Sequence, residues 1–336
     1  MSNLETTQDL VEAAEILIGE KPDGNSPFRS QLLSEMNRAQ RLICAGGGEL
    51  NSAFNKVQRS VDQPIIFSWA KSKYPYVFNL QPAESTGTVL VTNNSSAIVF
   101  SSAPADSRTG WYIKISNDQE IYRIASHMAG DTAATLDAAY VGTTNLAATF
   151  DRIKLVYDIT PSDGILQIAG PLNSYLSQLG NENDWKIDII SERAYNKMES
   201  FQNVIELMPD KAAVIKHDEA TLSLIFNGFP ANLERVELPY VPVPLPMAVG
   251  GQDSIIPKDL RKILSHLAAA YVMLGEDDDR RAENLTIAFS LWESLVSRDK
   301  AVFQAGNEKA GKVFSNRLRT FNKQKGRKFT SDGWPI

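Results

Sequence analysis

The fold of this chain is decided by one stretch, Trp111-Tyr112-Ile113-Lys114-Ile115-Ser116-Asn117-Asp118-Gln119-Glu120-Ile121-Tyr122-Arg123-Ile124. β-Branched and aromatic side chains dominate its two halves, and the polar residues Ser116 to Gln119 separate them. The first kind of residue favours strands, whereas Asn, Asp and Ser favour turns. The stretch therefore predicts an antiparallel β-hairpin.

Short runs of the same kind lie on both sides of the hairpin. Pro, Gly, Asn and Ser separate the runs, as is typical of the turns between strands. In the last run apolar side chains alternate with others, so we expect one buried face. Many short strands at this spacing favour a small barrel or sandwich. The expected strands lie at 65–67, 76–78, 89–91, 98–100, 135–137, 140–142 and 150–159.

A second β-rich stretch covers residues 204–247. Leu222, Leu224 and Phe226 alternate with other residues, and Asn227-Gly228 is a turn signal. The stretch ends in a proline-rich run at 239–246. Proline cannot donate a hydrogen bond to a β-ladder, so this run is predicted to be an extended edge or connecting segment.

Helical patterns occupy both ends of the chain. An apolar stripe at Leu10–Leu17 can be capped by Thr6 or Thr7. A second helix is expected from an N-cap at Ser26 to a stop at Gly46-Gly47-Gly48. Apolar stripes lie at 260–274 and 285–296, and the segment Gly275–Asp279 lies between them. This short connection predicts an antiparallel helical hairpin.

Together these patterns predict an α+β protein. The N- and C-terminal helices are expected to form a helical body, with one or more antiparallel β-barrel or sandwich domains inserted between them. The expected segments are an N-terminal helical segment at 1–60, an antiparallel β module at 64–160, a second β-rich region with the proline-rich edge at 161–250, a helical hairpin at 255–304 and a basic arm at 307–336.

The charge is divided unevenly along the chain. The net charge of −6 combines residues 307–336, with eight basic and two acidic groups, and residues 1–306, with 26 basic and 38 acidic groups. An acidic body with a basic tail suggests that the two meet different partners. The sequence has no long apolar run and no basic-then-apolar opening, and Cys44 is its single cysteine. We therefore expect a protein made in a reducing cytoplasm, with no membrane contact.

The sequence offers little for catalysis or for a cofactor. Neither His127, His217 nor His266 has metal-ligand spacing to another histidine or to Cys44, so all four residues are expected to be structural or solvated. The acidic run at 276–279 can suit Mg²⁺ or Ca²⁺, but it can equally charge the N-terminus of the next helix. We favour the second interpretation, and we predict no enzyme activity, no catalytic residue, no cofactor and no metal site.

The basic arm at 307–336 mixes cations with aromatic residues. A disordered tail is one interpretation, although such tails are usually poor in aromatic residues. The other is an arm that orders on a partner, with aromatic anchors and with cations that meet an acidic protein surface or DNA phosphate. The candidate partner-binding residues are Lys309, Lys312, Phe314, Arg317, Arg319, Phe321, Lys323, Lys325, Arg327, Lys328, Phe329 and Trp334.

Three parts of the chain resemble the head-to-tail connector (adaptor) proteins of tailed bacteriophages. Asn37-Arg38-Ala39-Gln40-Arg41 is similar to the helix that opens many of these proteins. The β runs from Trp111 to Tyr157 resemble a β module that recurs in phage neck and tail proteins. The closing helices, with Leu267–Leu274 followed by Asp278–Trp292, resemble the C-terminal helices of the same family. The chain is longer than the compact adaptors, and residues 64–250 hold more β structure than their core requires.

The resemblance implies a non-enzymatic subunit of the virion neck, assembled in the host cytoplasm. Its helices would form the body of a homo-oligomeric ring, typically of twelve subunits, that docks on the portal protein and continues the DNA channel. The β regions would decorate this ring or meet tail, nozzle or fibre components. The basic arm would engage the portal, while genomic DNA would pass an acidic lumen during ejection without sequence-specific binding.

Two alternatives remain open at this level. The chain can be another neck or tail structural protein, such as a tail terminator, a tube protein or an accessory protein. It can also be a DNA-binding protein that uses its basic tail, in which case its affinity for DNA would fall steeply with salt.

Overall fold

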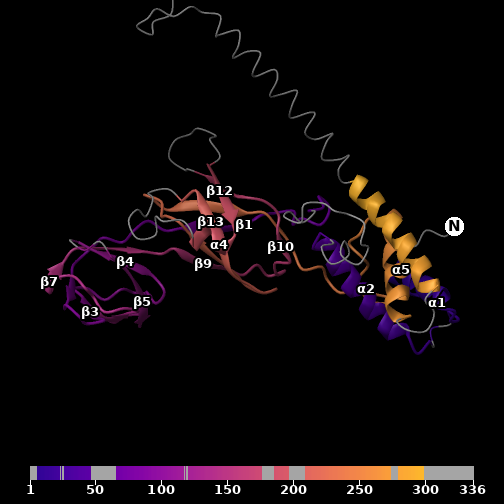
Figure 1. Ribbon diagram of the computed structural model, residues 1–336, viewed down its shortest axis with the longest axis horizontal. Coiled ribbons are helices and arrows are strands. Elements are labelled where there is room, and N and C mark those ends of the chain that lie inside the picture. Colours follow the sequence, from indigo (N-terminus) through magenta and orange to yellow (C-terminus); the bar gives the residue numbers. More distant parts are fainter. Residues whose placement is uncertain are drawn as a thin grey trace, which may run out of the picture. The chain divides into compact units, whose positions relative to one another are not determined.

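The computed structural model of this chain describes residues 6–22, 24, 26–46, 66–116, 118, 120–175, 185–196, 209–273 and 279–298. The chain separates into two compact units, one of Met1–Ala70 with Pro244–Ile336 and one of Lys71–Val243. The first, here called the helical unit, contains helices from both ends of the chain, and the second, the β unit, contains the strands (Figure 1). The predicted α+β class is confirmed.

The helical unit is built on amphipathic helices whose apolar faces pack together. Thr6 caps the first of them in a capping box with Asp9, whose backbone N–H donates to the Thr6 side chain at 3.2 Å. Ser265 donates to the backbone oxygen of Leu10 at 2.8 Å and so joins two of the helices. The elements are α1 (Thr7–Leu17), α2 (Arg29–Cys44), η2 (Lys258–Leu260), α5 (Lys262–Val272) and a last helix over residues 279–298.

The boundaries of α2 differ in part from those expected. The helix begins at Arg29 and has no side-chain cap, because Ser26 instead accepts the Phe28 backbone N–H at 3.3 Å in a turn before the helix. Its C-terminal end is as expected: Gly46, just beyond the cap residue Ala45, has a φ of 84°. This left-handed conformation suits glycine.

The last helix runs antiparallel to α5, as the helical hairpin predicts. His266 of α5 bonds Asn284 at 2.8 Å, whereas Asp259, before α5, pairs with Arg298, the last described residue of the last helix. The residue earlier in the first segment therefore contacts the residue later in the second, so the two segments run in opposite directions. Among the described residues, no helix is long and apolar enough to cross a membrane.

The first barrel of the β unit is a sheet whose two outer strands follow each other in the chain. Its strand order is β7-β2-β3-β6-β5-β4-β8. Only Thr149 separates β7 from β8, so this one segment pairs with β2 at one end and with β4 at the other and closes the sheet. The strands are β2 (Val89–Val91), β3 (Ala97–Phe100), β4 (Tyr112–Ile115), β5 (Ile121–His127), β6 (Ala133–Leu136), β7 (Asn145–Ala148) and β8 (Phe150–Ile153).

The second barrel has the order β1-β15-β11-β12-β13-β14-β9. The backbone N–H of Gln81, just after β1, donates to the Tyr157 hydroxyl of β9 at 2.8 Å, so the two edges of this sheet approach each other. The strands are β1 (Tyr76–Leu80), β9 (Val156–Ile159), β11 (Leu172–Tyr175), β12 (Trp185–Ile190), β13 (Lys211–His217), β14 (Leu222–Phe226) and β15 (Glu234–Leu238); β10 (Gln167–Ile168) pairs with β16 (Tyr240–Val241), and α4 spans Glu192–Asn196.

The structure departs from the expected β regions in four ways. Strands β12 and β13 are parallel, so the second sheet is not wholly antiparallel. The expected boundary at residue 160 does not separate the two sheets. Both β1 and β9 precede this residue in the sequence, yet both belong to the second barrel. Ile66 and Phe67 form no strand, and the Phe67 side chain is buried in the helical unit. Residues 140–142 form no strand either, although Tyr140 packs in the core of the first barrel.

Tyr157 gives the β unit a predictable response to alkaline pH. Burial raises the pKa of Tyr157 from 10.0 to about 12. The folded protein therefore keeps this proton at a pH at which the unfolded chain has released it, and the stabilisation is complete below pH ~10 and is lost as the pH rises through ~12. By pH 11 this residue alone should lower the free energy of unfolding by about 1 kcal/mol.

Urea unfolding at pH 8 and pH 11 checks this expectation. Tyr157→Phe should lose less stability between the two pH values than the natural chain does, whatever its stability at pH 8. The exposed Tyr74 provides the control, because Tyr74→Phe should leave the difference between the two pH values unchanged. Equal losses in the natural chain and in Tyr157→Phe would contradict the prediction.

Candidate functional site

The two barrels meet in an apolar junction inside the β unit. Ile153 of β8 and Leu155, which links the barrels, pack with Ala213 of β13, Ile225 of β14 and Tyr195 of α4. The Tyr195 hydroxyl also donates to the backbone oxygen of Phe226 at 2.9 Å. The junction therefore joins the two barrels through side chains from both of them.

An ion cluster of Glu84, Arg108 and Arg152 lies beside this junction. The Glu84 carboxylate accepts from Arg108 at 2.7 and 3.1 Å and lies 2.9 Å from the Arg152 guanidinium. The backbones of Glu84 and Arg152 also exchange hydrogen bonds of 2.8 and 2.9 Å. One carboxylate thus holds two cations at the place where both connections between the barrels pass.

Aromatic rings complete the surroundings of the two arginines. Arg152 lies over the rings of Phe100 and Phe150, at 4.6 and 5.1 Å from their centroids, and Arg108 lies over Trp111 at 4.4 Å. Desolvation lowers the pKa of Arg152 from its ordinary value, while Glu84 opposes the shift. The Arg152 side chain is 8% exposed, and its Nε and Nη1 atoms have no hydrogen-bond partner among the residues that the structure describes. The rings and Glu84 are therefore what stabilises this buried charge.

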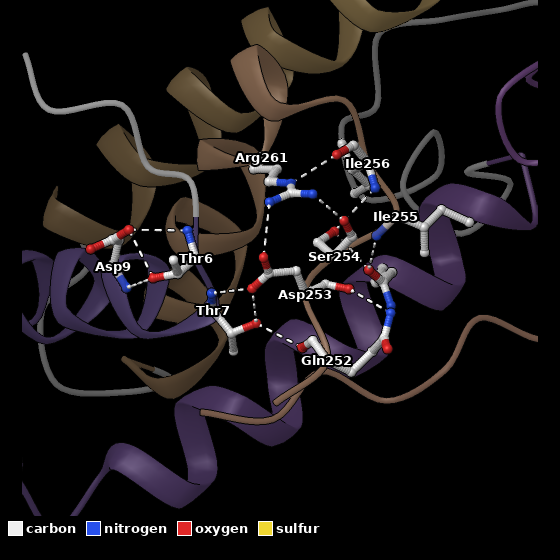
Figure 2. Close-up of polar contacts among 10 residues, drawn as sticks. Thr6, Thr7, Asp9, Gln252, Asp253, Ser254, Ile255, Ile256 and Arg261 are labelled. Carbon is white, nitrogen blue, oxygen red and sulfur yellow. Dashed lines mark hydrogen bonds and ion pairs between the residues drawn. The ribbon is translucent and has the colours of Figure 1, made fainter. Parts of the chain in front are cut away.

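A polar network in the helical unit joins the two ends of the chain. The Thr7 backbone N–H donates to Asp253 at 2.9 Å, and the Thr7 hydroxyl donates to the Gln252 backbone oxygen at the same distance (Figure 2). Arg261 donates to the backbone oxygens of Ser254 and Ile256 at 2.6 and 3.0 Å. These bonds fix the segment before α5 against the start of α1.

Gln40 extends the same network to α2. Its side-chain oxygen accepts from the Ser254 hydroxyl at 2.6 Å and from the Ile255 backbone N–H at 3.1 Å. Two residues of the motif Asn37-Arg38-Ala39-Gln40-Arg41 thus have structural partners, since Asn37 also accepts the Met247 backbone N–H at 2.6 Å. In this chain the motif binds the segment that returns from the β unit.

Each of the three histidines makes a hydrogen bond within the fold. His127 accepts the Arg108 backbone N–H at its Nδ1 and bonds the Asp131 backbone oxygen through its Nε2, both at 3.0 Å. His217 bonds the Ile165 backbone oxygen at 2.9 Å, and His266 bonds Asn284. Each of these hydrogen bonds fixes a ring in the fold.

Cys44 is buried at the end of α2, and burial raises the pKa of its thiol from 9.0 to about 12. A thiol with this pKa holds almost no thiolate near neutral pH, and the thiolate is the nucleophile and metal ligand. Cys44 is therefore unsuited to nucleophilic or redox chemistry.

Metal ligands do not come together in the part of the chain that the structure describes. There, no three His, Cys, Asp or Glu side chains are placed to hold an ion. Of the acidic run at 276–279, only Asp279 is described, as an exposed residue in the first turn of the last helix.

The predicted partner-binding arm at 307–336 lies outside the described residues. The junction ion cluster was not predicted, although the sequence contains one signal for it. Arg152 lies two residues after the apolar Phe150 on β8, so the two side chains point to the same face of the strand. A charge is therefore placed on the inward face of β8.

No family model matches this chain, and no curated protein matches it in sequence.

Proposed function

We propose that this chain is a structural subunit of the neck of a tailed bacteriophage, of the head-to-tail adaptor type. In this proposal, copies of the helical unit form a closed ring of about twelve subunits under the portal protein. The β unit decorates this ring or offers surfaces to tail components. The protein acts through shape and surface, and it is not an enzyme.

The organisation of the chain is the observation on which the proposal rests. The two ends of the sequence build one helical unit, and the whole β unit is inserted between its halves at residues 70–71 and 243–244. Bonds from Thr7 to Asp253 and from Gln40 to Ser254 fasten these halves together. This organisation supports a ring body that carries β decorations, because the helical unit is held together by its own bonds and the β unit is added to it as an insertion.

Charge supports the same proposal. Residues 1–306 carry a net charge of −12, and residues 307–336 carry +6. A negative lumen would let DNA pass without holding its phosphates. The basic arm, with Phe314, Phe321 and Trp334 as anchors, would reach an acidic surface of the portal.

Electron microscopy of the purified full-length protein, alone and mixed with the portal ring of the same virus, tests the proposal. We expect closed rings that stack on the portal, and we expect a chain without residues 307–336 to stay folded but to lose portal binding. Open tubes, a lone monomer under all conditions or portal binding that survives the truncation would contradict the corresponding part. Binding to DNA that falls steeply with salt would favour the DNA-binding alternative.

A further inference from the structure

One half of the first barrel carries no charged side chain. Residues 85–105, 132–136 and 138–150 contain no Asp, Glu, Lys or Arg, in a chain of which 22% is charged. These residues include the strands β2, β3, β6 and β7. The acidic and basic residues of the barrel lie elsewhere, on β4, β5 and β8, in the segments that precede β4 and β5, and at the two ends of β6.

Apolar side chains cross the outside of this uncharged half in one row. Leu90 of β2 is directly opposite Val99 of β3, which is opposite Ala133 of β6. Leu146 of β7 lies beside Leu90, because the pairs Val91–Asn145 and Val89–Ala148 flank it. Met128 directly follows β5, and because His127 pairs with Ala134, Met128 comes next to Ala133 and continues the row. Val99, Met128 and Leu146 are 41%, 73% and 74% exposed, and we call this row the uncharged row.

The row reaches two opposite flanks of the barrel. Because β7 and β8 form one continuous segment, the closed sheet has six positions around its axis. Strands β7 and β6 are three positions apart, which places them on opposite sides. Leu146 therefore marks one flank, and Ala133 with Met128 marks the other.

The chemistry of the row selects its partner. A charged group brought against an uncharged apolar surface loses its hydration and gains no counter-charge, so the partner surface must also lack charge. DNA and a basic or acidic peptide fail this requirement. Depletion of charge with exposed apolar residues is instead the composition of the centre of a protein–protein interface.

We infer that the uncharged row is the contact between neighbouring copies of this chain, with the Leu146 flank of one first barrel against the Met128 flank of the next. A second copy supplies an uncharged apolar surface of the same composition, and the net charge of −12 over residues 1–306 disfavours contacts between copies through charged surfaces. Contact between two different flanks is heterologous, and heterologous contacts are the kind that close a ring. This inference rests on the proposed ring and names the surface that would join the subunits of its β layer.

Cysteine cross-linking of the full-length protein tests the inference. The natural Cys44 is buried with a raised thiol pKa, so a bis-maleimide reagent should act only on introduced cysteines. We expect the double variant Leu146→Cys with Met128→Cys to give a ladder of covalent oligomers, whereas each single variant should give none. The control pair, Leu146→Cys with the exposed Ala125→Cys of β5, should also give none.

A charge placed on the row gives an independent measurement. Leu146→Glu should weaken assembly roughly tenfold or more, as measured by sedimentation, while Ala125→Glu should not change it. A covalent dimer from Leu146→Cys alone would overturn the flank-to-flank contact. Intact rings without a ladder would overturn the inference and leave the proposed function standing. A natural chain that sediments as a monomer at every concentration would overturn both.

Discussion

Replacing Glu84 by Gln should destabilise the β unit by roughly 2–4 kcal/mol. The substitution keeps the shape of the side chain but removes the only carboxylate that pairs with Arg152 among the described residues. A buried charge that loses its partner usually costs about 3–5 kcal/mol, and because Glu84 is 30% exposed we expect a loss about 1 kcal/mol below this range. The loss should appear in urea unfolding.

Hydrogen exchange locates the same effect. The Glu84 and Arg152 backbone N–H groups bond each other's carbonyl oxygens across the connections between the barrels, and both should exchange faster in Glu84→Gln. Glu237→Gln is the matched control: Glu237 pairs at 2.9 Å with Arg235, whose side chain is 57% exposed, so the loss should stay below about 1 kcal/mol.

Adding Arg152→Met to Glu84→Gln should recover part of the lost stability, because no unpaired charge then remains at that position. A loss in Glu84→Gln no larger than that in Glu237→Gln would show that the ion cluster does not hold the barrels together.

Replacing Trp292 by Ala should destabilise the helical unit by about 3–5 kcal/mol. Trp292 lies in the last helix, is 2% exposed and packs edge-on against Phe67 at 5.5 Å between ring centroids. Removal of a fully buried aromatic side chain loses its transfer free energy and leaves a cavity that the helices fill only partly.

Circular dichroism at 222 nm during urea unfolding measures this loss, because the long helices belong to the helical unit. Trp292→Phe should cost less, since an aromatic ring would still contact Phe67. The neighbouring exposed Glu293 is the control, and Glu293→Ala should change the stability by less than about 0.5 kcal/mol. A small loss in Trp292→Ala would mean that the last helix contributes little to the core of this unit.

Local features of the fold could be predicted because they depend on neighbours in the sequence. The hairpin at 111–124 forms as β4 and β5, with Tyr112 opposite Arg123 and Ile113 opposite Tyr122. The capping box at Thr6 and the helix stop at Gly46 are equally local. In each case a short pattern determines both the element and its end.

The pairing of distant strands could not be predicted in the same way. Alternation shows which face of a strand is buried but not which strand lies beside it. β1 pairs with β15, which begins at Glu234, and β9 pairs with β14, so the second barrel is assembled from strands on both sides of the first barrel in the sequence. The parallel pair β12–β13 is likewise invisible in the pattern of either strand.

The junction ion cluster shows the same limit. Residue parity on β8 indicates that Arg152 points inward and therefore needs a carboxylate. It does not indicate which of many acidic residues supplies that carboxylate. The answer, Glu84, follows only from the β-bridge between the two connections.

The β unit begins and ends at one place in space. The Ser72 backbone N–H, one residue after the unit begins, donates to the Tyr240 backbone oxygen at 2.9 Å, three residues before the unit ends. Because the two ends of the β unit are held together, the unit connects the two halves of the helical unit as a tight turn would. The entropy of closing this connection therefore does not depend on the length of the β unit. The β unit can therefore be enlarged, replaced or removed while the helices keep their packing.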